Sequence, residues 1–276
     1  MENNSNMILV LGANGKTGSR VAKKLEALNL SVRKGSRTAQ PKFDWEDQNT
    51  WAAALDGIKR VYITFQPDLA VKGAEACIAA FVETARKAGV QQLVLLSGRA
   101  EPEAQRCEQI VMESGLNWTI VRASWFNQNF SESFLMEPIA AGYVALPVSG
   151  VKEPFIDADD IADVVVAALT AEGHDRKIYE VTGPRLISFK EAIDEIAQAT
   201  NRSIEYVELP LSDYISQMRA YQVPEASIEL ISYLFREVLD GRNESMTTGV
   251  EEALGRKPKD FSQYVKDSIA DQVWLG

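Results

Sequence analysis

Apolar and polar residues alternate along the first 122 residues in blocks that predict strands and helices in turn. Met7–Leu11 is an uninterrupted apolar run of strand length, and the residues 19–28 that follow place Val21, Leu25 and Leu28 on one helical face. The later blocks predict short strands at 30–34 and 43–45, a helix at 48–55, a strand at 60–64, a helix at 71–88, a strand at 92–98, a helix at 103–113 and a strand at 117–122. Such alternation predicts a doubly wound α/β fold, in which helices cover both faces of a parallel sheet.

A glycine-rich loop separates the first strand from the first helix. Gly12, Gly15 and Gly18 form a GxxGxxG pattern, and each glycine has a physical role in a dinucleotide-binding loop. Gly12 permits the sharp turn, Gly15 lets the backbone approach a pyrophosphate, and Gly18 lets the helix pack close to the sheet. The free N–H groups of the helix N-terminus then face the phosphates. The loop therefore predicts a Rossmann-type cofactor site, and a plain structural turn is the alternative.

The turn after the second strand bears on which dinucleotide is bound. An NAD-specific protein offers Asp or Glu to the adenosine ribose at this position, whereas this chain has Ser36 and Arg37. Arg37 can make a charge-assisted contact with a 2′-phosphate, and Ser36 can add a hydroxyl donor. We therefore expect NADP(H) rather than NAD, although Arg33 and Lys34 could simply belong to a solvated basic turn.

The pattern changes after residue 123, where aromatic residues, glycines and prolines mix with short strands. A helix is expected from Asp157–Asp160 to Leu169, a strand at 177–181, and helices at 188–200, 212–221, 225–240 and 260–271. The aspartates at 157–160 are interpreted as helix N-caps rather than catalytic groups. We expect one domain over residues 1–276, with residues 1–123 as the nucleotide-binding core and residues 124–276 as a smaller, mainly helical substrate lobe.

Composition excludes several other classes of protein. The chain has 276 residues, of which 46% are hydrophobic and 25% charged, and its net charge of -10 gives no general attraction to nucleic acid. No apolar stretch reaches 18 residues and the start is polar, so no membrane association and a cytoplasmic location are expected. Cys77 and Cys107 form no CxxC pair and are expected as reduced packing thiols. No cluster of side chains predicts a metal site, and the oligomeric state is left open.

In doubly wound sheets, ligands bind beyond the carboxyl ends of the strands. The segments that end the predicted strands should therefore line one crevice. The residues predicted to contact the cofactor are Gly12, Asn14, Gly15, Lys16, Thr17, Gly18, Ser36, Arg37, Phe65, Gln66, Pro67, Ser97, Gly98 and Phe126. For Ser97, a hydrogen bond to the cofactor or to a substrate atom and a role that merely caps the turn are equally open.

These motifs together resemble the NmrA-like atypical short-chain dehydrogenase/reductases. The segments that carry the resemblance are the glycine loop at 12–18, the Ser36–Arg37 pair, the strand at 93–98, the strand at 118–122 with the segment 125–130, and Pro154–Asp157. Within this group, Lys42–Asp47 and Trp125–Ser131 are most similar to the ergot-alkaloid branch of festuclavine and agroclavine dehydrogenases. The resemblance covers nearly the whole chain and implies NADPH binding, in a group that includes quinone and dye reductases and redox-sensing regulators. Ala123 replaces the usual proline of the group.

The sequence lacks the Tyr-Lys pair that short-chain reductases commonly use for catalysis. Short-chain reductases commonly use a Tyr to protonate the nascent alkoxide, with a Lys four residues later that lowers the pKa of the Tyr. None of the eight tyrosines has this spacing, so catalytic residues remain unassigned. An iminium carbon becomes neutral when it accepts a hydride and needs no such acid, and a quinone or other conjugated acceptor could take its proton from water. Glu101 lies close enough to the missing Tyr position to serve as an alternate acid, but we expect it as an exposed carboxylate.

Aromatic residues predict an apolar pocket for an aromatic or polycyclic small molecule. Each of these side chains could equally belong to the core of the lobe. The residues predicted to line the pocket are Trp125, Asn127, Phe130, Phe155, Tyr214 and Met218. His174, the single histidine, is expected in a surface loop.

Two functions follow from these features. The favoured one is an NADPH-dependent reductase of an imine, iminium or conjugated carbonyl compound. The alternative is a protein that binds NADP(H) without catalysis and reports the redox state to a partner.

Overall fold

The computed structural model describes residues 7–148 and 150–274, and the chain divides into two compact units. Unit 1 contains the chain up to Ala123 together with Ala158–Val181 and Thr248–Arg256. Unit 2 contains Ser124–Asp157, Thr182–Thr247 and the residues from Lys257 onward.

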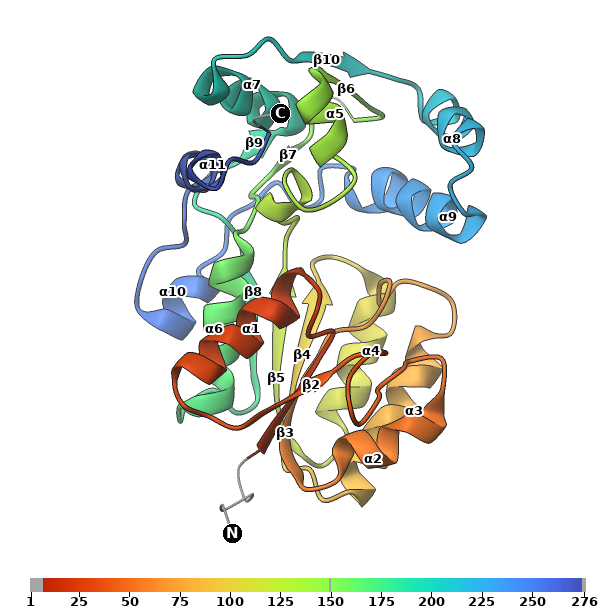
Figure 1. The fold of residues 1–276 in the computed structure, drawn as a ribbon, viewed down its shortest axis with the longest axis vertical. Helices are drawn as coiled ribbons and strands as arrows, with labels where there is room; N and C mark the ends of the chain where they lie inside the picture. Colours follow the sequence, from red (N-terminus) through yellow and green to blue (C-terminus); the bar gives the residue numbers. More distant parts are fainter. Residues whose placement is uncertain (1–6, 149, 275–276) are drawn as a thin grey trace. The chain divides into compact units, whose positions relative to one another are not determined.

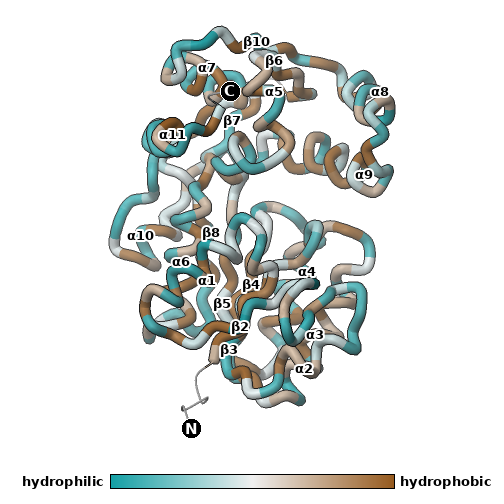
Figure 2. The backbone as a smooth tube through the Cα atoms, viewed as in Figure 1, coloured by the Kyte–Doolittle hydropathy of each residue, from teal (hydrophilic) through white to brown (hydrophobic). Residues whose placement is uncertain are grey.

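Unit 1 is built on a parallel six-stranded sheet (Figure 1). The sheet has the strand order β2-β1-β3-β4-β5-β8, and its strands other than β2 carry buried hydrophobic residues (Figure 2). Their bounds are Met7–Leu11 for β1, Val32–Gly35 for β2, Ile58–Ile63 for β3, Gln92–Gly98 for β4, Asn117–Ala123 for β5 and Lys177–Val181 for β8. The chain runs from β1 to β2 on one side and then to β3 on the other, so the carboxyl ends of β1 and β3 form the switch point where doubly wound sheets bind ligands.

Helices cover both faces of this sheet (Figure 1). One face carries α1 (Lys16–Ala27) and α6 (Ala158–Thr170), with α10 (Gly249–Leu254) beside α6. The other carries α2 (Trp51–Leu55), α3 (Ala74–Lys87) and α4 (Pro102–Met112). The α/β class predicted from the sequence is thereby confirmed.

The predicted strand at 43–45 does not form. This segment has no strand partner, and its aromatic side chains pack on the helical layer instead. The ring of Phe43 lies 5.7 Å from that of Phe81 in α3, and Trp45 Nε1 donates a hydrogen bond to the carbonyl oxygen of Thr64. Burial of aromatic surface against α3 therefore replaces strand pairing, and the alternation of buried rings misled the sequence prediction.

Unit 2 combines two small sheets with helices. β6 (Tyr143–Leu146) pairs in parallel with β10 (Glu205–Glu208), and β7 (Lys152–Glu153) pairs antiparallel with β9 (Ile187–Ser188). The helices are α5 (Met136–Ala141), α7 (Phe189–Thr200), α8 (Leu211–Ala220), α9 (Glu225–Tyr233) and α11 (Phe261–Ala270), with a π-helical turn at Leu234–Val238 and a 3-10 turn at Asn127–Asn129. Short strands were expected after residue 123, but neither the bounds of these four strands nor the helices α5 and α10 were predicted, because runs of two to six residues carry too little periodicity.

The boundary between core and lobe differs from the prediction. Residues 158–181 and 248–256 were assigned to the substrate lobe, but they belong to unit 1. β8 extends the main sheet by pairing with β5, and α6 packs beside α1. The aspartates before and within α6 make ion pairs, with Asp160 bound to Arg256 at 2.6 Å and Asp157 3.4 Å from Lys259. These contacts favour the structural interpretation of the acidic segment.

Candidate cofactor site

The glycine loop connects β1 to α1 at the switch point of the sheet. Gly12 has a φ of +61°, and a Cβ atom there would lie 2.2 Å from Oγ1 of Thr64. A Cβ atom on Gly18 would lie 2.2 Å from the carbonyl oxygen of Gly12. Gly12 therefore makes the left-handed turn, and Gly18 allows α1 to pack directly against the loop.

The start of α1 has the features expected of an anion-binding helix N-terminus. Its N-cap residue is Gly15, no side chain caps the first turn, and the first turn contains no acidic residue. A Cβ atom on Gly15 would meet only the Gly12 carbonyl oxygen at 3.3 Å and Nε2 of Gln66 at 4.0 Å. The N–H groups and the positive end of the helix dipole are thus available to a phosphate.

The residues between these glycines have different surroundings. Asn14 is exposed and Lys16 is half-buried. Thr17 is buried, and its hydroxyl accepts a hydrogen bond from the Tyr62 hydroxyl at 3.0 Å. This bond ties α1 to β3, and burial raises the pKa of Tyr62. Thr17 is therefore held in place by the fold before any ligand arrives.

The cations of the basic turn after β2 differ in their contacts: two are bonded to the fold and one is not. Arg33 donates hydrogen bonds to the carbonyl oxygens of Ala54 and Asp56, and Lys34 pairs with Glu26 at 2.8 Å. Arg37 is exposed and makes no hydrogen bond or ion pair with any residue in the described part of the chain.

Ser36 lies beside Arg37 in the same turn. Its hydroxyl lies 3.3 Å from that of Thr38, within the exposed part of the turn. Ser36 and Arg37 therefore remain the residues of this turn that are predicted to bind a phosphate.

The loop after β3 brings Phe65, Gln66 and Pro67 to the same end of the sheet. Gln66 and Pro67 are exposed, and Gln66 reaches toward Gly15. Phe65 is half-buried, and its ring centroid lies 4.9 Å from that of Trp45. The segment 43–45, although not a strand, therefore supports the loop at the end of β3.

Ser97, at the end of β4, is engaged within the protein. Its hydroxyl donates a hydrogen bond to Oε1 of Glu108 at 2.6 Å, and Ser97 is 4% exposed. Glu108 is fully buried and accepts three further hydrogen bonds from Arg122, at 2.6–3.0 Å. Of the two interpretations left open by the sequence, this geometry favours the structural one, in which Ser97 completes a buried network.

Gly98, the neighbour of Ser97, is pressed against Glu101. A Cβ atom on Gly98 would lie 2.1 Å from Oε1 of Glu101. The expectation of an exposed Glu101 is wrong, because this side chain is 7% exposed. Burial and the nearby carboxylate of Asp68 raise the pKa of Glu101 to about 9. Asp68 follows Pro67 in the loop after β3. Sequence reasoning missed this pair because 33 positions separate its members and no local pattern links them.

The residues predicted for a substrate pocket lie in unit 2. Phe130 is fully buried and Phe155 is 2% exposed, with their rings 5.2 Å apart inside the aromatic core. Of the two interpretations left open by the sequence, this burial favours the core for Phe130 and Phe155 over the pocket wall. Met218 is 7% exposed, and Trp125 and Tyr214 are half-buried with their rings against Phe235. These three remain predictions for the pocket.

Two residues of the loop after β5 also remain predictions. Phe126 is half-buried, and its backbone bridges to Ile156. Asn127 is fully buried, and neither atom of its amide group has a hydrogen-bond partner among the described residues. The Asn127 backbone N–H donates to the Ile156 carbonyl oxygen at 2.8 Å, which fixes the loop.

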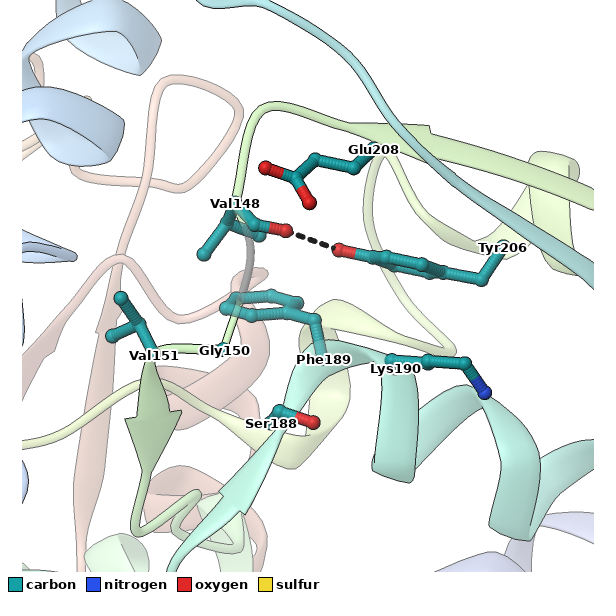
Figure 3. A pocket seen from close by; sticks show the side chains of 8 residues that line it. All are labelled: Val148, Gly150, Val151, Ser188, Phe189, Lys190, Tyr206 and Glu208. Atoms are coloured by element: carbon teal, nitrogen blue, oxygen red, sulfur yellow. Dashed lines mark hydrogen bonds between the residues drawn. The ribbon is translucent and has the colours of Figure 1, made fainter.

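Unit 2 also contains a cavity of about 250 Å³ (Figure 3). The Tyr206 hydroxyl donates a hydrogen bond to the carbonyl oxygen of Val148 across it, at 2.8 Å. The lining residues are Val148, Gly150, Val151, Ser188, Phe189, Lys190, Tyr206 and Glu208. None of them is among the residues predicted to line the substrate pocket.

His174 is not the surface residue that the sequence suggested. It is 9% exposed, and its Nδ1 lies 2.8 Å from the Tyr179 hydroxyl. Burial lowers the pKa of His174. Among residues 7–148 and 150–274, no group of three or more His, Cys, Asp or Glu side chains is arranged to hold a metal ion.

Comparison with known proteins agrees with the glycine loop and the sheet. Residues 12–172 match the family described as NAD(P)H-binding, which is more than half of the chain. The protein therefore belongs to this NAD(P)H-binding family. Within the described residues, no helix combines the length and hydrophobicity of a membrane-spanning segment.

Relatives of similar length extend the match over the whole chain. Prestalk A differentiation protein A of Dictyostelium discoideum is 27% identical, covering 96% of this chain and 93% of the relative. Agroclavine dehydrogenase of Claviceps fusiformis is also 27% identical, covering 97% and 98%.

Solved structures share the fold. The NADPH-dependent quinone oxidoreductase QOR2 of Escherichia coli, complexed with NADPH, has a TM-score of 0.76 at 17% identity and covers 95% of this chain and all of its own. NmrA, a negative transcriptional regulator in complex with NADP, has a TM-score of 0.70 at 17% identity, covering 99% and 100%. The NmrA-like resemblance seen in the sequence is thus supported at the level of fold.

Proposed function

We propose that the protein is an NADPH-dependent reductase that delivers a hydride to an imine, an iminium or a conjugated carbonyl of a small molecule. The observation that carries the proposal is the open, uncapped start of α1 behind Gly12 and Gly15, at the switch point of the sheet. Membership of the NAD(P)H-binding family and the similarity to agroclavine dehydrogenase support it.

The residues at this edge of the sheet fit a dinucleotide with a 2′-phosphate. The backbone of the glycine loop and the first turn of α1 would hold the pyrophosphate, and Arg37 with Ser36 would bind the 2′-phosphate. When bound, NADPH supplies the hydride, so the protein has to bind, orient and exclude water. The available guanidinium of Arg37 supports NADPH over NADH, because an unpaired cation there favours a dianionic group.

The absence of the Tyr-Lys pair limits the kinds of compound that the protein could reduce. A simple ketone needs an acid to protonate the alkoxide that hydride addition creates. An iminium becomes neutral on accepting a hydride, and a conjugated carbonyl spreads the developing charge over several atoms. Both acceptors tolerate the absence of a tyrosine acid, which supports them over a simple ketone.

A second candidate is a redox sensor without catalysis. The structural similarity to NmrA, which is described as a transcriptional regulator, favours this alternative. A sensor needs the cofactor site but no proton donor and no substrate surface.

Oxidation of NADPH by the purified protein separates these functions. The acceptors to compare are a cyclic iminium, a quinone, an enal and a simple ketone, each followed by loss of NADPH absorbance. The proposal expects turnover of the iminium, the enal or the quinone, with the ketone inert. Tight NADPH binding without oxidation by any acceptor would favour the sensor.

The variant Phe126→Ala tests whether a substrate surface exists. If the loop after β5 contacts the substrate, turnover should fall by much more than the affinity for NADPH, because the glycine loop that would hold the phosphates is intact while Phe126 is itself predicted to contact the cofactor. Tyr221→Ala is a matched aromatic control, because Tyr221 is 83% exposed. Equal effects of the two substitutions would contradict a substrate surface at Phe126.

A further inference from the structure

The cavity of about 250 Å³ in unit 2 shares no residue with the candidate cofactor site (Figure 3). Its lining comes from three segments of the chain, namely the residues around Gly150, the start of α7 at Ser188–Lys190, and β10 with Tyr206 and Glu208. A water molecule occupies about 30 Å³ in the liquid, so this volume corresponds to roughly eight non-hydrogen atoms. The cavity therefore suits a small organic molecule and is too small for a nucleotide.

The walls of the cavity combine apolar surface with one face of a strand. Val148 is 6% exposed, Val151 is half-buried, and the ring of Phe189 belongs to the hydrophobic core of unit 2. Tyr206 and Glu208 are two positions apart on β10, so their side chains lie on the same face of the strand. That face brings an aromatic ring and a carboxyl group to the cavity together.

The hydroxyl proton of Tyr206 already has an acceptor. It is donated to the carbonyl oxygen of Val148 at 2.8 Å. Burial and the nearby charge of Glu208 raise the pKa of Tyr206 to about 12, so the hydroxyl stays protonated at neutral pH. Its oxygen can therefore only accept a further hydrogen bond.

The carboxyl group of Glu208 has no hydrogen bond or ion pair with the described residues. Figure 3 shows this group pointing toward Val148, on the side of the cavity where the Tyr206 hydroxyl lies. Its charge also acts on the pKa of Tyr206, which agrees with that position. An ionised carboxylate only accepts hydrogen bonds and pairs best with a cationic donor. The polar groups at this side of the cavity thus favour a cation.

The lining offers an anion much less. Nζ of Lys190 lies 2.6 Å from Oδ2 of Asp194, one turn further along α7, and Figure 3 shows it directed away from Glu208. The start of α7 is closed by a capping box, in which Ser188 Oγ accepts a hydrogen bond from the Glu191 backbone N–H at 3.1 Å and the Ser188 backbone N–H donates to the Glu191 carboxylate at 2.7 Å. Among the lining residues that the structure describes, an anion would find neither an unpaired cation nor an open helix N-terminus.

We propose that this cavity binds a small organic cation, a protonated amine of about eight non-hydrogen atoms. Its nitrogen pairs with the Glu208 carboxylate and donates a second hydrogen bond to the carbonyl oxygen of Val148. Its apolar body lies against Val151 and the ring of Tyr206, and an aromatic ring itself attracts a cation near its face. The site lies wholly in unit 2, so this inference goes beyond the proposed reductase function and does not depend on it.

Calorimetric titration of the full chain at neutral pH tests the charge that the cavity selects. The probes are benzylamine, which is a cation, benzyl alcohol, which is neutral with the same number of non-hydrogen atoms, and benzoate, which is an anion. A hydrogen bond between charged groups contributes about tenfold to more than a hundredfold in affinity. Benzylamine should therefore bind at least about tenfold more tightly than benzyl alcohol, and benzoate should bind more weakly than either.

Glu208→Gln removes the negative charge and keeps the size of the side chain. The variant should bind benzylamine at least about tenfold more weakly and bind benzyl alcohol within about twofold of the wild type. Glu205→Gln is the matched control, because Glu205 is exposed on the same strand but three positions away, on the opposite face. This control has the same change in net charge and should bind benzylamine like the wild type.

Nuclear magnetic resonance of the valine methyl groups locates the ligand. Benzylamine should shift the signals of Val148 and Val151 in the wild type, and shifts confined to other valines would overturn the site. Equal affinities for benzylamine and benzyl alcohol, or wild-type affinity in Glu208→Gln, would overturn the selection of a cation. Benzoate that binds more tightly than benzylamine and loses affinity in Lys190→Ala would also overturn it, because the cavity would then select anions.

Discussion

The guanidinium of Arg33 donates a hydrogen bond to the backbone carbonyl oxygen of Asp56, 2.6 Å away. This bond ties β2 to the end of α2 and commits Arg33 to the fold. Four residues later, Arg37 remains exposed and without a hydrogen bond or ion pair to the described residues. The structure therefore distinguishes two arginines that the sequence presents as one basic turn.

Arg37→Ala should weaken NADPH binding and leave NADH binding unchanged. Loss of a charge-assisted phosphate contact corresponds to about 1.5–3 kcal/mol, or roughly tenfold to more than a hundredfold in Kd. Titration calorimetry with both cofactors measures the effect. Lys34→Ala is the control, because it removes a charge from the same segment whose side chain pairs with Glu26. Equal weakening of NADPH and NADH by Arg37→Ala would refute the phosphate contact.

Gly15→Ala should lower the affinity for NADPH, whereas Gly18→Ala should lower the stability of the fold. Gly15 has a φ of -87°, which alanine adopts, and its nearest contact is 3.3 Å away. The variant should keep the wild-type free energy of unfolding to within about 1 kcal/mol and lose NADPH affinity, because its methyl group occupies the phosphate approach.

In Gly18→Ala the methyl group overlaps the Gly12 backbone at 2.2 Å, so the free energy of unfolding should fall by about 1–3 kcal/mol. Urea unfolding and NADPH titration of both variants check these results. A Gly15→Ala protein that binds NADPH like the wild type would show that the phosphate does not lie against Gly15.

Glu108→Gln should destabilise unit 1. The substitution breaks a buried ion pair with Arg122, whose side chain is 21% exposed, and weakens the bond to Ser97. Removing the charge of Glu108 should cost up to about 3 kcal/mol, because Arg122 keeps only Glu180, 3.9 Å away, as a counterion. Urea unfolding gives the change, and the exposed Glu113→Gln, expected within about 0.5 kcal/mol of the wild type, is the control. A wild-type stability for Glu108→Gln would show that the network is dispensable.

The free energy of unfolding should fall with rising pH because of Glu101. In the unfolded chain this carboxyl group loses its proton near its ordinary value of 4.5, whereas in the folded protein its pKa is about 9. Between these values the folded state binds more protons, so stability falls by up to about 1.4 kcal/mol per pH unit. The difference between wild type and Glu101→Gln in urea unfolding from pH 5 to 9 measures this slope. Parallel curves for the two proteins would mean that Glu101 ionises normally.

The parts of the fold with strong local signals were predictable from the sequence. The strand Gln92–Gly98 and the strand Lys177–Val181 have the predicted bounds, because continuous apolar runs bounded by turns specify buried strands. The glycine loop was predictable for a similar reason, since its spacing encodes the turn and the close packing of α1.

The errors come from contacts between distant residues. Phe43 and Trp45 look like strand residues but are captured by α3, and no local pattern reports a partner 36 residues away. Glu101 looks like a solvated carboxylate until Asp68 and Gly98 enclose it. Burial and pairing of this kind depend on tertiary structure, which single-sequence patterns do not contain.

The most direct test of the account follows the hydride itself. The purified protein is given NADPH that carries deuterium at the transferable position, together with a cyclic iminium or an enal, and the products are analysed by mass spectrometry. The account predicts one deuterium bound to carbon in the reduced product of the accepted substrate. Oxidation of the cofactor without deuterium in the product, or no oxidation with either acceptor, would contradict direct hydride delivery by this protein.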